Sequence, residues 1–261
     1  MFFIPKFPTA LHEATAAIVC DYFSNFPATD TVLVVNSCAR GHAAPESDLD
    51  FAVLVKPGTG REEVNKMEQE WQTYSETQPT ILEYKRLSRF AHLHLDVIDG
   101  TYTPTILEVG VASDYFEIEI GNQVCYSAPL GKAGDFFKEL QNKWLPYYDD
   151  KLRMQRFLMC REACNYDLDH IPFFIRSGLH FQAFDILCKA FQEYLQTLFI
   201  ANKTYPIAYN KWIKEQIVTW LNLPDLYPKL PGIISVSNIE SDEINHKAGL
   251  LRVLLDDIKP V

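Results

Sequence analysis

Two aspartates with one residue between them stand at the start of an apolar segment, where they could take part in chemistry. Asp48 and Asp50 lead into Phe51–Val55, a run of apolar residues that is typical of a buried strand. Because side chains alternate along a strand, both carboxylates are expected to point to the same side. Like charges held this close repel each other, and apolar neighbours increase the repulsion. A bound cation relieves this conflict, so the pair predicts a metal site.

Magnesium is the cation that suits these ligands. Hard Mg²⁺ binds carboxylate and phosphate oxygens together and keeps some of its water molecules. Two such ions roughly 3.5–4 Å apart can steady both the attacking and the leaving oxygen of an in-line displacement. Asp48 and Asp50 therefore predict phosphoryl-type chemistry that uses two Mg²⁺ ions.

A polar turn precedes the aspartates and follows another strand-like segment, Thr31–Val35. Ser37 offers its hydroxyl group, and the backbone around it offers N–H groups, to an anion. Arg40 adds positive charge, and Gly41 permits a sharp turn. The phosphates of a substrate are expected to lie on this turn, although a salt bridge from Arg40 to Asp48 is an alternative role for the arginine.

This stretch resembles the signature of the polymerase-beta-like nucleotidyltransferases, which is an apolar strand, Gly-Ser, a short loop that often contains Ala-Arg-Gly, and then Ser-Asp-hydrophobic-Asp. The resemblance is strong over Thr31–Val55 and looks closest to the antibiotic (aminoglycoside and lincosamide) and minimal nucleotidyltransferases. The residues that fall on the pattern are Ser37, Ala39, Arg40, Gly41, Ser47, Asp48 and Asp50. Asn36 stands where the family has glycine. Because asparagine tolerates a left-handed backbone better than most residues, the turn is expected to keep its shape.

The resemblance implies that the first half binds a metal–triphosphate complex and that a helical second half closes the acceptor site. A nucleoside monophosphate, with AMP expected, would pass from the triphosphate to a hydroxyl group of a small acceptor such as an antibiotic. The family's nucleotide-binding positions fall here on Asn36, Ser37, Arg40, Gly41 and Ser47. A non-catalytic nucleotide-binding module, or a toxin–antitoxin partner of the minimal nucleotidyltransferase type, stays open as the alternative.

The family also uses a third carboxylate on a neighbouring strand, where it shares a metal ion and can accept a proton from the acceptor. Asp96 is the first candidate, because it lies within the alternating segment His92–Val97. Asp99 is the alternative, but it precedes Gly100 and is typical of a turn.

Two further groups of side chains could bind ligands. His92 and His94 share a strand face with Asp96, but two imidazoles without a further His or Cys at ligand spacing favour a polar face over a transition-metal site. Lys203 and Lys211 lie among aromatic residues and could hold phosphates while a ring stacks on a base. Exposed lysines beside buried rings at a helix end are the alternative for the second group.

The elements that must position these residues predict an α+β protein. Residues 1–130 are expected to form a mixed twisted sheet with flanking helices, and residues 131–261 a helical acceptor-binding bundle. In the first helix Leu11, Ala14, Ile18 and Tyr22 share one face, with Thr9 as its cap. The expected strands are Thr31–Val35, Phe51–Val55, His92–Val97 and Tyr115–Ile120, with a loop over 121–134 after them. The expected helices are Thr9–Phe23, Arg61–Thr77, Ser177–Leu198, Asn210–Leu221 and Ser241–Asp257.

The composition limits the classes of binding partner and the cellular location that are expected for this protein. The 261 residues carry a formal net charge of −10, which argues against a broad nucleic-acid surface and suits a cationic acceptor. The six cysteines show no CxxC spacing and are expected to be reduced thiols. The sequence shows neither a signal-peptide core nor a membrane-spanning run, so a cytoplasmic protein without a membrane partner is expected.

Overall fold

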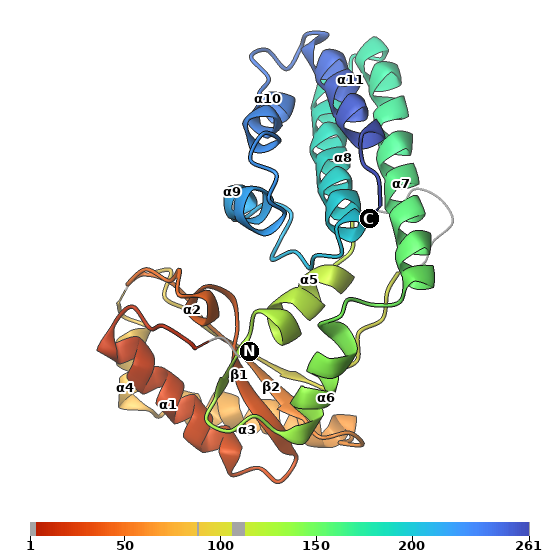
Figure 1. Cartoon of the computed structure of the whole chain (residues 1–261). Helices are drawn as coiled ribbons and strands as arrows, with labels where there is room; N and C mark the ends of the chain where they lie inside the picture. The colour runs from red at the N-terminus through yellow and green to blue at the C-terminus, as the bar shows by residue number, and fades with distance from the viewer. Residues whose placement is uncertain (1–3, 88, 106–112, 261) are drawn as a thin grey trace. The chain divides into compact units, whose positions relative to one another are not determined.

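The computed structural model describes residues 4–87, 89–105 and 113–260. The chain forms two compact units that are interleaved along the sequence (Figure 1). Unit 1 consists of Met1–Tyr102 and Glu119–Pro146, and unit 2 of Thr103–Ile118 and Tyr147–Val261. Unit 1 contains the sheet and unit 2 is helical, so the predicted α+β class is confirmed. The boundary expected at residue 130 stays a prediction about where independent domains separate.

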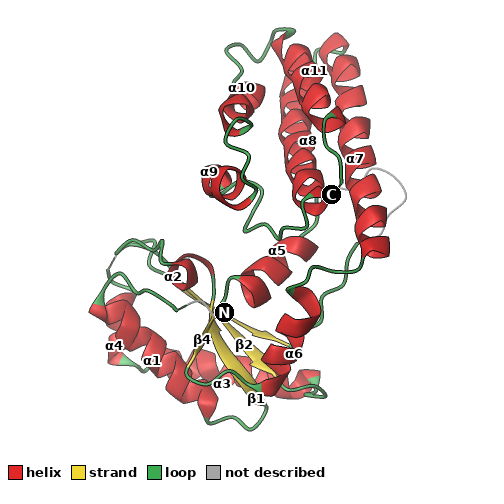
Figure 2. Ribbon diagram, in the orientation of Figure 1, coloured by secondary structure: helices red, strands yellow, loops and turns green. Residues whose placement is uncertain are grey.

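In the described residues of unit 1, four strands form one mixed sheet in the order β3-β2-β1-β4. Figure 2 shows the strands of this sheet in yellow. These strands are β1 (Thr29–Val34), β2 (Leu49–Val55), β3 (Leu93–Ile98) and β4 (Ala128–Leu130). β1 runs antiparallel to β2 and β4, whereas β2 and β3 are parallel. Three of the strands were predicted within a few residues. The short edge strand β4 contains Pro129, which an edge tolerates because proline lacks the N–H that an inner strand must donate.

One face of this sheet packs on α1 (Ala10–Ser24), α3 (Arg61–Ser75) and α4 (Pro79–Tyr84). Alternate residues of β2 belong to this core, and they are Leu49, Phe51, Val53 and Val55. The residues between them, including Asp50, therefore point to the other face of the sheet. The alternation that packs the core thus also places Asp50 on the face away from these three helices.

The first helix begins as predicted, and three of the four residues expected on its inward face, Leu11, Ile18 and Tyr22, pack against the core, but its fully buried residues lie beside them. Thr9 is the N-cap and its side chain accepts a hydrogen bond from the His12 amide. Ala14, expected on the buried face, is exposed. The buried residues are His12, Thr15, Ala16, Val19 and Phe23. A periodicity based on apolar residues missed this face because two of its members are polar.

A bulge in β1 ties the sheet to α6 (Asp135–Trp144). The register of β1 shifts between Thr29 and Thr31, and the carboxylate of Asp30 between them accepts hydrogen bonds from the amides of Phe136 (3.1 Å) and Phe137 (3.0 Å). Asp30 thereby satisfies free N–H groups at the start of that helix. A Cβ atom on Gly134 would overlap the same carboxylate, so a larger residue there would displace the Asp30 side chain.

The strand expected over Tyr115–Ile120 is wrong. This segment begins α5 (Phe116–Ile120), which continues into the π-helix η1 (Gly121–Cys125). Phe116 and Ile120 are both buried, and their spacing of four residues fits a helix turn as well as it fits alternation. The loop expected over 121–134 is also wrong in part, because it contains η1 and β4.

Unit 2 is built on two long helices, α7 (Asp150–Arg176) and α8 (His180–Ala201), which pack along each other with α11 (Glu243–Asp256) beside them. The aromatic and aliphatic residues of α8 that gave the helical periodicity, such as Leu187 and Phe191, belong to this core. The shorter elements are α9 (Ile213–Glu215), the π-helix η2 (Gln216–Trp220), the 3₁₀ helix η3 (Tyr227–Lys229) and α10 (Leu230–Ile234). The helices expected near Ser177–Leu198 and Ser241–Asp257 are confirmed, whereas the one over Asn210–Leu221 begins later and changes to π geometry.

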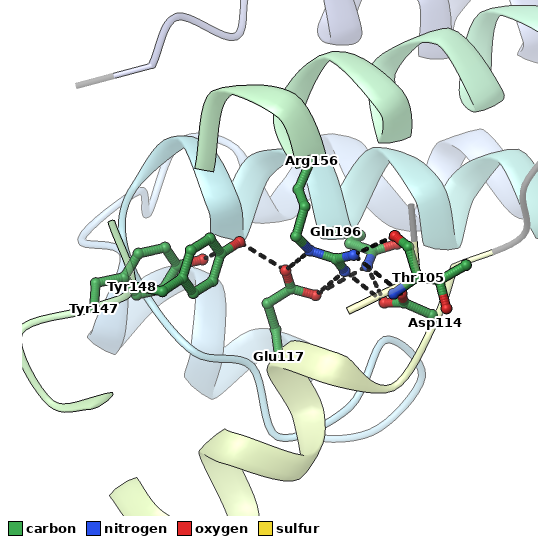
Figure 3. A network of polar contacts seen from close by, with 7 residues as sticks. All are labelled: Thr105, Asp114, Glu117, Tyr147, Tyr148, Arg156 and Gln196. Atoms are coloured by element: carbon green, nitrogen blue, oxygen red, sulfur yellow. Dashed lines mark hydrogen bonds and ion pairs between the residues drawn. The ribbon is translucent and has the colours of Figure 1, made fainter. Parts of the chain in front are cut away.

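A buried arginine joins the segment before α5 to the long helices of unit 2 (Figure 3). Arg156 on α7 is 0% exposed and donates to both Glu117 and Asp114, at 2.6 Å each from Nε and Nη2. Gln196 on α8 donates to the same two carboxylates, and the Tyr148 hydroxyl donates to Glu117 at 2.7 Å. These donors compensate for the burial of the carboxylates, so the network holds the segment in the helical core.

All six cysteines are free thiols, as predicted. No helix in the described parts of the chain combines the length and the apolar character needed to cross a membrane.

Candidate functional site

The turn after β1 has the backbone that its sequence suggested. It forms α2 (Asn36–Arg40), in which Asn36 has a φ of 58°, and Gly41 follows with a φ of 75°. Both values lie in the left-handed region, which asparagine and glycine enter more readily than other residues. The amide of His42 donates to the Ser37 carbonyl at 2.9 Å and closes the turn. Asn36 thus has the left-handed backbone that was expected to let the turn keep its shape.

The two aspartates of the motif stand at the opening of β2. Asp50 is half-buried in the strand, and its carbonyl accepts a hydrogen bond from the Val35 amide at 3.0 Å. The Asp48 side chain is 41% exposed, so a ligand can reach it. One of its oxygens, Oδ1, accepts a hydrogen bond from the His92 amide at 3.0 Å. Asp48 directly precedes β2, so a common side for the side chains of residues 48 and 50 stays a prediction from strand alternation.

The parallel pairing of β2 and β3 places Asp96 on this same face. Asp50 is in register with His94, and Ala52 with Asp96. Side chains in register on adjacent strands point to the same face. Asp96 is two residues after His94, the partner of Asp50, and therefore points to the same face as Asp50. Asp99 follows the end of β3, and its carboxylate accepts a hydrogen bond from the Thr101 amide at 2.8 Å. Asp96 thus shares the sheet face of Asp50, whereas Asp99 lies beyond the end of β3.

These three carboxylates are not a preassembled metal site. The described residues contain no group of three or more His, Cys, Asp or Glu side chains arranged to hold a metal ion. The expectation that Asp48, Asp50 and Asp96 already converge is therefore not met. The donor chemistry still fits Mg²⁺, because oxygen ligands from two adjacent strands share one face and remain partly open to solvent. His94 belongs to the same surface, with its Nε2 4.0 Å from Asp48 Oδ2.

The charges of the acidic pair reach neighbouring groups. Burial, with a contribution from the charge of Asp50, raises the pKa of the Cys38 thiol to about 12. Burial and the charges of Asp48 and Asp50 also raise the pKa of Tyr84. Cys38 is therefore a neutral thiol at physiological pH and is no nucleophile, because the thiolate is the reactive form.

Arg40 and Ser47 flank the loop that leads from α2 to β2. Arg40 is half-buried at the end of α2, and its positive charge acts on the hydroxyl of Tyr126 against the effect of burial, which raises the pKa of that tyrosine. The Ser47 hydroxyl accepts a hydrogen bond from the Ala44 amide at 2.8 Å and so shapes the loop before Asp48. A structural role for Ser47 is thus visible beside the nucleotide-binding role that the resemblance implied.

Two buried residues that the sequence did not single out support this loop. His12 on α1 and Tyr84 on α4 both hydrogen-bond the carbonyl of Ser47, at 3.2 and 2.9 Å. A polar residue on the inward face of a helix is a signal that could have found His12. Tyr84 resembles any core aromatic residue in the sequence, so its hydroxyl contact could not be foreseen.

The two lysines expected to bind nucleotide lie in unit 2. Lys203 has a φ of 48° and forms an ion pair with Asp150 on α7, 3.1 Å from Nζ to Oδ1. Lys211 is exposed. Tyr205, from the same segment, is buried and packs on Tyr147 with 4.6 Å between ring centroids. The ion pair and the buried ring agree with the simpler alternative of a helix end, and nucleotide binding by both lysines stays a prediction.

Comparison with known proteins gives one match. Residues 16–118 match the family model described as "Nucleotidyltransferase domain". No match was found among curated proteins or among solved structures. The matched segment contains the strands β1 to β3, the turn at Ser37 and the carboxylates of Asp48, Asp50 and Asp96. The match therefore supports a nucleotidyltransferase domain of the polymerase-beta-like superfamily in this chain, and with it nucleoside monophosphate transfer in general.

Proposed function

We propose that this protein is a Mg²⁺-dependent nucleotidyltransferase that moves a nucleoside monophosphate, with AMP the expected group, from a nucleoside triphosphate to a hydroxyl group of a small acceptor. The observation that supports the proposal is the register of β2 and β3, which puts Asp50 and Asp96 on one face of the sheet, with Asp48 directly before β2. The domain match over the same segment supports it independently.

Each part of this surface has a role in the proposed reaction. Ser37, Arg40 and the backbone of the turn bind the triphosphate. Asp48, Asp50 and Asp96 hold Mg²⁺, which when bound supplies positive charge for an in-line displacement. The acceptor oxygen forms a bond to the α-phosphorus, the bond from that phosphorus to the bridging oxygen breaks, and pyrophosphate leaves. Asp96 accepts the proton of the acceptor hydroxyl as general base.

The proposed acceptor is a small and preferably cationic molecule, with aminoglycoside-type antibiotics as one class. A net charge of −10 attracts cations and repels the phosphate backbone of RNA. The helical unit 2 is proposed to contribute the acceptor site, as in the antibiotic-modifying enzymes that the sequence resembles.

The test is a transfer assay with each of the four α-labelled nucleoside triphosphates, Mg²⁺ and a panel of hydroxyl-bearing acceptors that includes aminoglycosides and lincosamides. Labelled product and pyrophosphate release are expected with the parent protein and not with Asp50→Asn. Calorimetry of ATP binding, with Mg²⁺ and with a chelator, runs in parallel. Binding without transfer to any acceptor would favour the non-catalytic module, and the absence of both would overturn the proposal.

A further inference from the structure

Two buried polar side chains converge on the peptide group that precedes Asp48. His12 and Tyr84 come from different helices, and both are 0% exposed. The Tyr84 hydroxyl donates to the Ser47 carbonyl at 2.9 Å, and His12 Nε2 donates to the same oxygen at 3.2 Å. The two rings also touch edge to face, with 5.0 Å between their centroids. Two buried donors in the core therefore hold the Ser47 carbonyl, which directly precedes Asp48.

Tyr84 also reaches the strand that contacts the Asp48 side chain. Its hydroxyl lies 3.2 Å from the His92 carbonyl, which also accepts a hydrogen bond from the Leu49 amide at 2.9 Å. The amide of the same residue, His92, donates to Asp48 Oδ1. The Tyr84 hydroxyl thus lies between the carbonyls of Ser47 and His92. Ser47 precedes Asp48 in the backbone, and the His92 amide holds the Asp48 carboxylate.

The hydrogen bonds of His12 define its tautomer. A carbonyl oxygen only accepts, so Nε2 carries the proton that points to Ser47. The other ring nitrogen, Nδ1, lies 2.8 Å from the Thr9 hydroxyl oxygen and accepts a hydrogen bond from it. The ring is a neutral donor whose orientation is set by the N-cap of α1.

We propose that Tyr84 and His12 are positioning residues that hold Asp48 in the orientation in which it shares a metal ion with Asp50, and that they thereby set the metal affinity of the site. This inference rests on the proposed function, because it takes Asp48 as a metal ligand. Hydrogen-bonded partners behind a ligand orient it, and their loss typically lowers metal affinity or activity about 10–100-fold.

Tyr84→Phe is the central variant because it removes only the bridging hydroxyl group. The Mg²⁺ concentration that gives half-maximal ATP binding, measured by calorimetry, is expected to rise about 10-fold or more. The Mg²⁺ dependence of transfer should shift by the same factor, while kcat at saturating Mg²⁺ stays closer to that of the parent. A general loss of folding would instead lower the active fraction at every Mg²⁺ concentration.

Two controls separate positioning from stability. Ile81→Val lies on the same helix at a side chain that is 0% exposed, and it removes packing without removing a hydrogen bond. It should lower the melting temperature and leave the Mg²⁺ dependence unchanged. His12→Gln keeps an N–H donor that can reach Ser47, whereas His12→Leu does not, so the Gln variant should stay closer to the parent. The pair provides the test if Tyr84→Phe does not fold.

The outcomes are distinguishable from failure of the proposed function. A parent-like Mg²⁺ dependence in Tyr84→Phe, or an equal shift in Ile81→Val, would overturn the positioning role while transfer by the parent stands. If the parent binds ATP with Mg²⁺ but transfers nothing, transfer fails as the function and the binding shift still decides the role of Tyr84. A parent that does not bind ATP in a Mg²⁺-dependent way would overturn both.

Discussion

Asp50 is the residue on which the proposed chemistry depends most directly, because it lies between the Ser37 turn and the neighbouring strand. Replacing it by Asn keeps the shape and one carbonyl oxygen but removes the charge that binds Mg²⁺. We expect a rate loss of about 10²-fold or more, since each factor of ten corresponds to about 1.36 kcal/mol in the barrier. Pyrophosphate release measures it.

The fold of this variant should survive, because removal of one of two neighbouring carboxylates relieves repulsion when no metal is bound. The melting temperature without added metal, compared with that of the parent, is the control. An active Asp50→Asn variant would contradict the hypothesis of a metal site, and an unfolded variant would show that Asp50 is a structural residue.

Asp96 on β3 and Asp99 just after its end offer a matched comparison. Asp96→Asn should abolish or strongly reduce transfer, because its carboxylate shares the face of Asp50. Asp99→Asn should be close to the parent, because the amide oxygen can still accept from the Thr101 amide. Rates measured side by side at saturating Mg²⁺ check the assignment. The reverse pattern would make Asp99 the third acid.

For single residues, the sequence predicted those features of the site in which the chemistry allows only a few residue types. The spacing of Asp48 and Asp50 and the left-handed tolerance of Asn36 followed from single residues and their neighbours. The contacts of His12 and Tyr84 with Ser47 did not, because they join positions that are 35 and 37 residues apart. Only the fold brings such donors to one carbonyl.

Between the elements α7 and α8, a buried acid is kept protonated. Glu193 is 1% exposed, and Asp167 and Lys189 are its charged neighbours. Burial and the charge of Asp167 raise the pKa of Glu193 to about 8, although Lys189 opposes this. With Glu193 neutral, Lys189 and Asp167 balance each other in charge.

The sign of the pH dependence follows from that shift. An acid whose folded-state pKa is raised contributes its full stability below the unfolded value of about 4.5, and this is lost as the pH rises through about 8. Glu193→Gln mimics the neutral form. The parent should lose about 2 kcal/mol or more, relative to this variant, between pH 5 and pH 9.

Urea unfolding at both pH values measures this difference. Glu162→Gln, at an exposed position of α7, is the control and should follow the parent. Parallel curves for the parent and Glu193→Gln would show that Glu193 is charged in the folded state.

Elements were predictable where one period dominates. The long apolar spacing of α8 and the apolar runs of β1 and β2 correspond to real elements. The segment Phe116–Ile120 was mistaken for a strand because Glu117 occupies a position that alternation assigns to solvent. In the structure that glutamate is buried by its partner Arg156, a contact that no local period contains.

At the scale of the whole molecule, the chain passes from one unit to the other after Tyr102, after Ile118 and after Pro146. The Arg156 network lies close in sequence to each passage, through Thr105, Glu117 and Tyr148. Tyr147, the first residue after the last passage, has a φ of 73°, which is rare for a bulky side chain. The network thus anchors the ends of the connections on the side of unit 2.

Removal of that arginine should be costly. Arg156→Met leaves the carboxylates of Glu117 and Asp114 buried without their main partner, and breaking a buried pair in this way costs about 3–5 kcal/mol. Arg161→Met is the matched control, because its pair with Asp256 is partly exposed and should contribute about 1 kcal/mol or less. Urea unfolding of both variants checks this, and equal effects would contradict the anchoring role.

The interleaving of the two units also sets an order in which the protein can form during its synthesis. Glu117 precedes Arg156 by 39 positions, and Asp114 precedes Gln196 by 82. A chain emerging from the ribosome therefore presents these two acids to water before their partners exist. The four described strands are all complete once Leu130 has emerged. The strands can therefore pair into the sheet before Arg156 and Gln196 are available to the two acids. The helical unit can close only after α8 has been made, although its first residues were among the earlier ones to appear.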